Sequence, residues 1–261
     1  MDARQSLTRT NAWAVARVLV AGFVAASLLA ASTSAGAATP TMAAKVSATP
    51  TSNPTSSPTS SPTPSAGASA YDLNSAASLT VVVNKVRPLK PVRYRPQVMG
   101  SYNLAKPASD ALTKMRAAMA KAGAGDLILA SGYRSYFSQK AIYERNLAKL
   151  GVSGAQKLTA MPGYSEHQTG LAADLAATGQ GCRIFMCFAD TPAGKWLAAN
   201  SWQFGFILRY PSGATKVTGY QYEPWHFRFV GKPLAAAMHK AKASVLETFL
   251  GLPAAPSYLT N

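Results

Sequence analysis

Two histidines and two acidic residues of this chain have the types and spacing of a hydrolytic metal site. His167 lies seven residues before Asp174 in the stretch GYSEHQTGLAADLAA, and the later stretch EPWHFR places Glu223 three residues before His226. Two imidazoles and one carboxylate are suitable protein ligands for a catalytic zinc ion, which leaves its fourth position to water. His167, Asp174 and His226 are therefore candidate metal ligands.

Glu223 fits the role of an acid/base beside such a metal. Zinc lowers the pKa of a bound water from about 15.7 to about 7, and a nearby carboxylate that is not a ligand can take the proton and pass it to a leaving amine. Residues three apart on a strand point to opposite faces, so Glu223 and His226 reach one cavity only if the chain kinks at Pro224.

Each of these signals has an ordinary structural alternative. A single histidine is more often a core or surface residue than a ligand, and the spacing of His167 and Asp174 is common in unrelated proteins. EPWH could be a strand segment whose Trp225 packs in the core, which we expect in either case. His239, the third of the 3 histidines, lies beside Lys240 on an expected solvent-facing helix, which indicates a structural role.

The elements that must position these residues alternate irregularly between strands and helices. Apolar runs bounded by turn residues predict strands, and helically spaced apolar residues with capping signals predict helices. We expect an α+β domain with a small, mostly antiparallel sheet flanked by helices. The expected strands are 126–135, 169–176, 204–211 and 222–231, with a strand or extended segment at 78–89. The expected helices are 108–123 (capped by Ser109 or Asp110 and stopped by Gly123), 135–151, 191–205 (capped by Thr191) and 233–251.

Composition divides the chain into three parts. Residues 1–37 have two early arginines, an apolar run over 18–31 and a small-residue cleavage site at Ala35–Ala37, which predict a signal peptide. The open alternative is an uncleaved membrane anchor. Residues 38–76 are rich in Ser, Thr, Pro and Ala, which predicts a disordered linker. Residues 77–261 are long enough for one globular domain with its own core. We therefore expect a secreted or cell-wall-associated protein.

Charge and cysteine content fit this location. With 26 Lys and Arg against 10 Asp and Glu, the net charge of +16 favours anionic partners. In an exported protein these are anionic cell-wall polymers rather than nucleic acid; the alternative is a basic surface with no particular partner. A membrane is expected as a partner only through an uncleaved leader. Cys182 and Cys187 are predicted to form a disulfide, with free buried thiols as the alternative.

Taken together, the motifs become specific. The pattern SxHxxGxAxD at 165–174, followed by EPWH at 223–226, resembles the paired zinc motifs of the VanY-like D-alanyl-D-alanine carboxypeptidases. The stretch SGYRSYFSQ at 131–139 resembles the arginine motif of the same family, and LTVVVNKVRPL at 79–89 resembles the usual start of its domain. The resemblance runs from about residue 79 to about residue 232, without a departure at the metal or base positions.

The resemblance implies a Hedgehog/DD-peptidase-like fold with one Zn²⁺ per chain, bound by His167, Asp174 and His226. Glu223 would be the catalytic acid/base. Arg134 would face the substrate, either polarising the scissile carbonyl or pairing with the terminal carboxylate, which an arginine can bind in bidentate fashion. Gln139 and Ser165 would help to hold the D-alanine end; their alternatives are a helix-surface glutamine and a local turn or capping serine.

The function expected from this resemblance is removal of the terminal D-alanine from peptidoglycan stem peptides by zinc-hydroxide attack. An L,D-carboxypeptidase and a peptidoglycan endopeptidase fit the same motifs. A non-catalytic wall-binding module is the alternative from another class. Glu223 argues against it, because a structural zinc site prefers four protein ligands and needs no free base.

Overall fold

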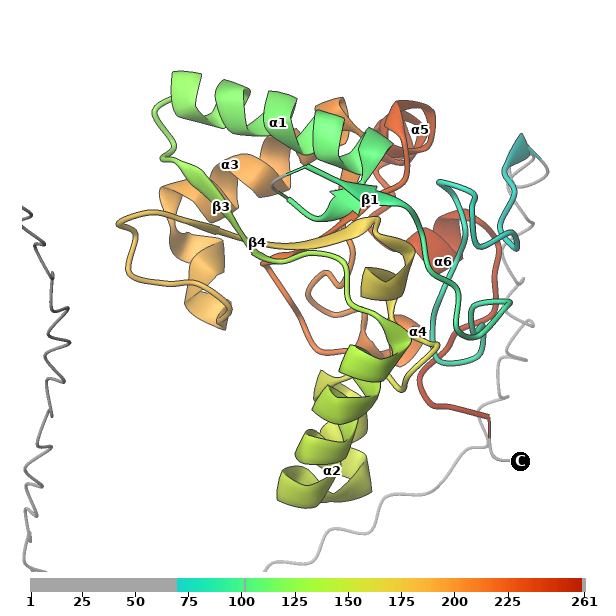
Figure 1. Ribbon diagram of the computed structural model, residues 1–261. Helices are drawn as coiled ribbons and strands as arrows, with labels where there is room; N and C mark the ends of the chain where they lie inside the picture. The colour runs from blue at the N-terminus through green and yellow to red at the C-terminus, as the bar shows by residue number, and fades with distance from the viewer. Residues whose placement is uncertain (1–69, 101, 260–261) are drawn as a thin grey trace, which may run out of the picture. The chain divides into compact units, whose positions relative to one another are not determined.

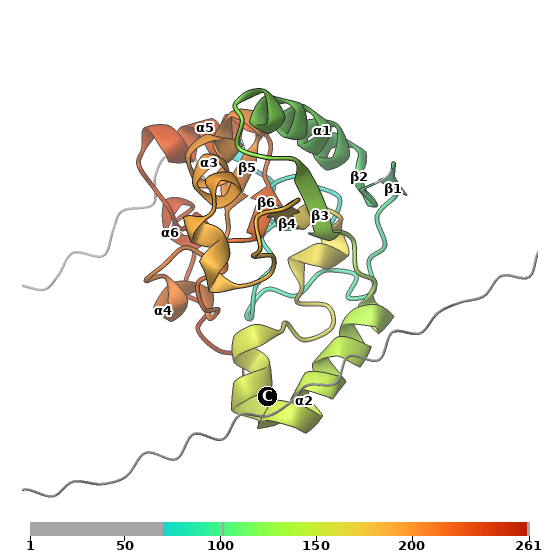
Figure 2. The ribbon, with the colours of Figure 1, turned by 90° about the vertical axis from the view of Figure 1, so that its left-hand side faces the viewer.

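A four-stranded antiparallel sheet with strand order β3-β4-β6-β5 forms the centre of the described chain (Figures 1 and 2). The computed structural model describes residues 70–100 and 102–259. The expected α+β class with a small antiparallel sheet and flanking helices is confirmed. The strands are β1 (Val98–Met99), β2 (Leu104–Ala105), β3 (Leu127–Ser131), β4 (Ala172–Ala177), β5 (Phe206–Leu208) and β6 (His226–Phe229). The helices are α1 (Lys106–Lys121), α2 (Tyr136–Leu158), α3 (Pro192–Asn200), α4 (Thr215–Thr218), α5 (Lys232–Lys240) and α6 (Leu246–Phe249), with 3₁₀ turns η2 (Glu166–Thr169), η3 (Met186–Asp190) and η4 (Ser201–Phe204).

The main core lies between the sheet and α1, which crosses it (Figure 1). Leu112, Met115 and Met119 of α1 are spaced at one helical turn and are fully buried, so this face of the helix packs on the sheet. Every residue of β4 is buried, and most of them are alanines, whose small side chains allow close packing on both faces. β4 is thus a rigid central strand, suited to carrying a functional side chain.

α2 extends away from the sheet and consists of two arms that meet at Gly151 (Figure 2). The helix was expected to end at this glycine. Gly151 has a positive φ of 67° and ends the first arm as expected, and a second helical arm follows the kink and reaches Leu158. Ser135 caps the start of α2 by accepting a hydrogen bond from the Ser138 amide. The second arm contributes Leu158 to the wall of a cavity that His167 and His226 also line.

Several expected boundaries were wrong. α1 begins at Lys106, so neither Ser109 nor Asp110 caps it, and Pro107 occupies its first turn instead. The expected helix 233–251 is two helices, because Lys242 has a positive φ of 53° between α5 and α6. Residues 78–89 form the extended segment, not a regular strand: their one bridge joins Asn84 and Arg87.

The two cysteines and the start of the domain add further detail. Cys182 and Cys187 form the expected disulfide. Residues 70–76, assigned to the linker, contain Leu73 and Ala76, which pack against the cores because they are apolar. The predicted signal peptide and residues 38–69 of the predicted linker lie outside the described residues. Across the described ranges, no helix combines the length and apolar character required to cross a membrane.

Candidate active site

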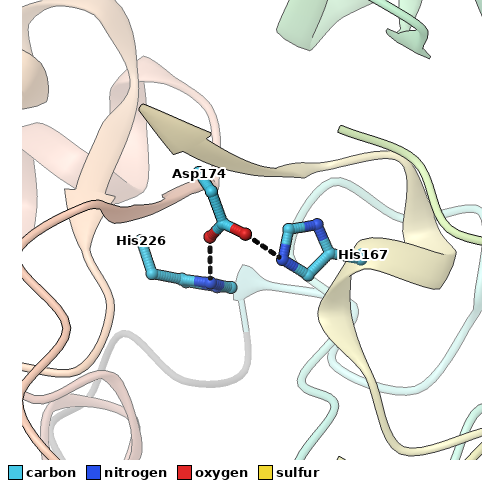
Figure 3. Close-up of side chains that lie close together, drawn as sticks. All are labelled: His167, Asp174 and His226. Carbon is cyan, nitrogen blue, oxygen red and sulfur yellow. Dashed lines mark hydrogen bonds and ion pairs between the residues drawn. The ribbon is translucent and has the colours of Figure 1, made fainter. Parts of the chain in front are cut away.

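His167, Asp174 and His226 converge although they lie on three different elements (Figure 3). Asp174 on β4 pairs in register with His226 on β6, so the sheet itself places these two side chains together. His167 lies on η2, directly before β4. One nitrogen or oxygen atom from each residue lies within 4.8 Å of the others, and all three side chains are buried. The expected convergence of these three residues is therefore present.

Gly170 forms the turn between η2 and β4. Its φ is 71°, in the left-handed region that glycine adopts without strain. A Cβ atom there would lie 3.0 Å from the Ala105 amide nitrogen and 3.3 Å from side-chain atoms of Pro96 and Val98. Both the backbone angle and the close packing favour glycine, which lets His167 and Asp174 meet within a few residues.

The two histidines present different nitrogens to the cluster. His167 Nδ1 lies 2.7 Å from the Gly132 carbonyl oxygen, to which it can only donate. The lone pair of this ring is therefore on Nε2, which lies 3.2 Å from Asp174 Oδ2. His226 Nδ1 lies 3.0 Å from Asp174 Oδ1. A backbone carbonyl that fixes one imidazole is typical of metal-binding histidines. Two imidazole nitrogens and a carboxylate in a buried site fit zinc.

Electrostatics prepares these groups for a cation. Burial raises the pKa of Asp174, but His167 and His226 outweigh it and hold this pKa well below its ordinary value. Burial lowers the pKa of His167, which favours the neutral, ligand-competent ring. For His226, burial also lowers the pKa, but the neighbouring carboxylates of Asp174 and Glu166 raise it to about 9. Metal binding at such a ring displaces the proton.

Glu223 lies beside the three candidate ligands. Its Oε2 is 3.7 Å from His226 Nδ1. The chain turns at Pro224 and Trp225, with the His226 amide donating to the Glu223 carbonyl at 3.0 Å, so the expected kink is present. Burial, reinforced by Asp174, raises the pKa of Glu223 to about 7 against the opposing effects of His226 and Arg134. A carboxylate with this pKa can both accept and donate a proton near neutrality.

Arg134 enters the same cavity just after β3. Its guanidinium donates to Ser131 Oγ and Gln139 Oε1, each at 2.9 Å, and lies 3.8 Å from Asp174 Oδ2. Burial lowers its pKa, against the effects of Asp174 and Glu223. Gln139 is fully buried, does not line the cavity and donates to the Ala160 carbonyl at 2.7 Å. In this structure Gln139 therefore contacts Arg134 and Ala160, both of which line the cavity.

The cavity has a volume of about 240 Å³ and mixes polar and apolar walls. Ser165 lines it, and its side chain makes no capping hydrogen bond to η2. Trp225 lines the cavity and also packs against the core, as expected. His239 lies elsewhere, stacked on Trp202 with ring centroids 3.9 Å apart. The remaining lining side chains include Ile142, Leu158, Ile184, Tyr210 and Tyr220.

Sequence reasoning missed a buried charged network behind His226. Glu166 Oε1 accepts from Arg209 Nε at 2.8 Å and from Arg228 Nη1 at 2.9 Å, and Arg209 also binds Glu247 through two hydrogen bonds. All four side chains are fully buried. Burial raises the pKa of Glu166, but the two arginines hold it well below its ordinary value. The available signal was a charge inside an apolar strand, as in HFRF and FILRY.

Comparisons with known proteins agree with this geometry. A family model described as VanY, D-alanyl-D-alanine carboxypeptidase, matches residues 101–232. The chain is 42% identical over 144 residues to "Putative carboxypeptidase YodJ" of Bacillus subtilis (strain 168), covering 55% of this chain and 52% of that protein. The chain spans about half the length of the curated relatives it matches.

Two solved structures are similar over most of their own length. One is the LD-carboxypeptidase LdcB, with 36% identity and a TM-score of 0.62, covering 67% of this chain and 87% of that one. The other is a mutant of VanY, a vancomycin-resistance D,D-pentapeptidase from a VanB-type cassette, in complex with Zn(II). It is 31% identical with a TM-score of 0.56, covering 65% of this chain and 97% of that one.

Proposed function

Because the chain belongs to the VanY family of D-alanyl-D-alanine carboxypeptidases, we propose that it is a zinc-dependent carboxypeptidase acting on peptidoglycan stem peptides. The observation that carries the proposal is the convergence of His167, Asp174 and His226 in one cavity with Glu223 beside them. The similarity to a VanY enzyme in complex with Zn(II) supports the choice of ion. The reaction proposed is hydrolysis of the last amide bond, which releases D-alanine.

Zinc bound by the three ligands would supply Lewis acidity at the scissile carbonyl and at the attacking water. Glu223 is placed to accept the proton that the water loses as its oxygen bonds to the carbonyl carbon. It then returns this proton to the amide nitrogen as the C–N bond breaks, so that the amino acid leaves as a neutral amine. A pKa of about 7 for Glu223 suits both steps near neutral pH.

Arg134 gives the cavity its preference for a chain end. Its guanidinium lies 3.8 Å from Asp174 Oδ2, and its side chain is 20% exposed. A free C-terminal carboxylate can pair with it in a charge-assisted hydrogen bond. Gln139 and Ser131 hold the guanidinium in place through its remaining donors. We propose that Arg134 binds the substrate terminus and that Ser165, which lines the same cavity, also contacts it.

Which terminal bond is cleaved is open to direct measurement. LdcB is an LD-carboxypeptidase and VanY is a D,D-pentapeptidase, and this chain is similar to both. The zinc-loaded full chain is incubated with pentapeptide, tetrapeptide and cross-linked stem peptides, and the products are identified by mass spectrometry. Release of D-alanine from the pentapeptide or tetrapeptide supports the proposal. If no substrate is cleaved, or if chelation leaves the rate unchanged, the proposal fails.

We further propose export, from the sequence of residues 1–37 alone. In this account the basic surface holds the enzyme near anionic wall polymers, and the Ser/Thr/Pro-rich segment acts as a tether. Fractionation of cells that produce the full chain tests this, with the protein expected outside the cytoplasm. Recovery only in the cytoplasm would contradict it.

A further inference from the structure

Two buried polar atoms lie opposite each other next to the candidate metal ligands. Glu166 Oε2 and His226 Nε2 lie 3.5 Å apart, and neither has a hydrogen-bond partner among the described residues. Both side chains are almost completely buried, so water does not easily replace the missing partner. Buried polar atoms are rarely left unpaired, and an oxygen acceptor opposite an imidazole nitrogen is a matched pair that a small shift would close.

We infer that Glu166 is a positioning residue that accepts the Nε2 proton of His226 and thereby directs the Nδ1 lone pair of His226 to the metal. The inference rests on the proposed function, because it assumes that His226 is a metal ligand. With Nε2 protonated, Nδ1 carries the lone pair that can bind a metal, and Nδ1 is the atom that lies 3.0 Å from Asp174 Oδ1. His167 has the opposite arrangement: its Nδ1 donates to the Gly132 carbonyl, and its Nε2 faces the Asp174 carboxylate.

The sheet and two arginines hold Glu166 in this position. Arg228 follows His226 by two residues on β6, so both side chains point to the same face. Arg209 follows β5, and its amide donates to the His226 carbonyl at 3.2 Å. Both arginines donate to Oε1 of Glu166, which leaves Oε2 free for His226. The carboxylate is thus fixed from one side and open on the other.

Glu166→Gln tests this role because the arginines dictate how the amide is oriented. Their donors keep the amide oxygen at the Oε1 position, so the NH₂ group faces His226 Nε2. A donor there favours protonation of Nδ1 instead, which removes a metal ligand. The matched control is Glu247→Gln, which removes the same charge from the same network. Glu247 also accepts hydrogen bonds from Arg209, but none of its hydrogen bonds within the described residues involves His226.

Zinc affinity of the full chain, measured by competition with a chromogenic chelator, separates the two variants. We expect Glu166→Gln to bind zinc about 10- to 100-fold more weakly than the wild type. Glu247→Gln should keep an affinity within about threefold of the wild type, even though it lowers the melting temperature. Equal zinc affinities in the two variants would overturn the inference, since a purely structural role predicts the same behaviour for both.

A second measurement needs no variant at the network. In the zinc-loaded wild-type chain, ¹⁵N NMR of the 3 histidines reports which ring nitrogen carries the proton, and His239→Gln identifies the signals of His239. We expect protonated Nε2 in His226 and protonated Nδ1 in His167. A protonated Nδ1 in His226 would overturn the inference but leave the proposed function intact. Failure of the wild type to bind zinc would overturn both.

Discussion

Each side chain of the candidate site has a distinct task that follows from its surroundings. Asp174 lies between two imidazoles, which lower its pKa, whereas burial and the neighbouring carboxylate of Asp174 raise the pKa of Glu223. Two carboxyl groups with separated pKa values indicate different roles, here ligand and acid/base. Arg134 is held by Ser131 and Gln139, so its orientation is fixed before substrate binds.

Glu223→Gln should abolish turnover without loss of the metal. The amide keeps the shape of the side chain but cannot accept the proton of the attacking water, so kcat should fall by about 10²- to 10⁴-fold. D-Alanine release gives the rate, and elemental analysis gives the zinc content. Loss of zinc together with activity would instead make Glu223 a ligand, and near-normal turnover would remove it from the chemistry.

Arg134→Lys should lower kcat/KM for stem peptides by about 10- to 100-fold, because lysine keeps the charge but loses the fork that binds a carboxylate and the contacts with Ser131 and Gln139. Arg116→Lys is the control, since Arg116 also makes a two-point contact, with Asp126, but on the surface. An equal effect of the two substitutions would show that Arg134 has no special place in the site.

At the scale of elements, the site depends on how η2, β4 and β6 meet. The register of β4 and β6 pairs Asp174 with His226, and Gly170 brings η2 close enough for His167 to join them. Every residue of β4 and β6 is buried, so Asp174 and His226 lie on a rigid frame.

Gly170→Ala should therefore destabilise the protein more than Gly123→Ala. Both glycines have left-handed φ values, 71° at Gly170 and 70° at Gly123, so each substitution costs about 1–2 kcal/mol in backbone conformation. At Gly123 a Cβ meets nothing within 4 Å, whereas at Gly170 it meets the Ala105 amide at 3.0 Å and adds about 1–3 kcal/mol of overpacking. Denaturant unfolding of both variants measures the difference. Equal losses would show that the tight approach at Gly170 relaxes freely.

The residues of the site could be predicted from the sequence better than the ends of the helices and strands that carry them. Two local motifs and their resemblance to a known family singled out His167, Asp174, His226 and Glu223, and the structure brings these four side chains into one cavity. The break at Lys242 was not predictable, since alanine and lysine around it favour a continuous helix. What breaks the helix is tertiary: α6 presents Glu247 to Arg209, a partner far away in the sequence.

At the scale of the whole described domain, the buried charged network joins segments near both ends of that domain to the site. Arg228 donates to the Val81 carbonyl at 2.7 Å, and Asn84 donates to Glu247 at 3.0 Å. Glu247 in turn holds Arg209, which contacts Glu166. The sequence signals buried charges only through the arginines inside apolar runs, and it could not reveal their partners, because isolated charged residues are expected at the surface. The leading extended segment is thus part of the support of the site.

This network should make stability sensitive to acid. Burial raises the pKa of Glu247, but Arg209 and Asn84 outweigh it and lower this pKa below its ordinary value of 4.5. Ionised Glu247 therefore stabilises the fold above about pH 4.5, and this contribution is lost as the pH falls towards the folded-state pKa. Glu247→Gln should be less stable at neutral pH, and its stability should fall less steeply below pH 4.5, by up to about 1.4 kcal/mol per pH unit.

Unfolding free energies measured across this range test the prediction. The control is Glu144→Gln, which removes an exposed ion pair with Lys140 and should leave the slope close to that of the wild type, because exposed pairs contribute little. A Glu247→Gln slope equal to the wild-type slope would show that this carboxylate does not contribute to acid sensitivity.

A crystal structure of the zinc-loaded full chain, with anomalous scattering measured at the zinc edge, tests the proposed metal site most directly. We expect one anomalous peak about 2.0–2.2 Å from His167 Nε2, the Asp174 carboxylate and His226 Nδ1. Glu223 should lie beside the ion without binding it. No peak in this cavity, or a peak bound by Glu223 in place of one of the three ligands, would contradict it.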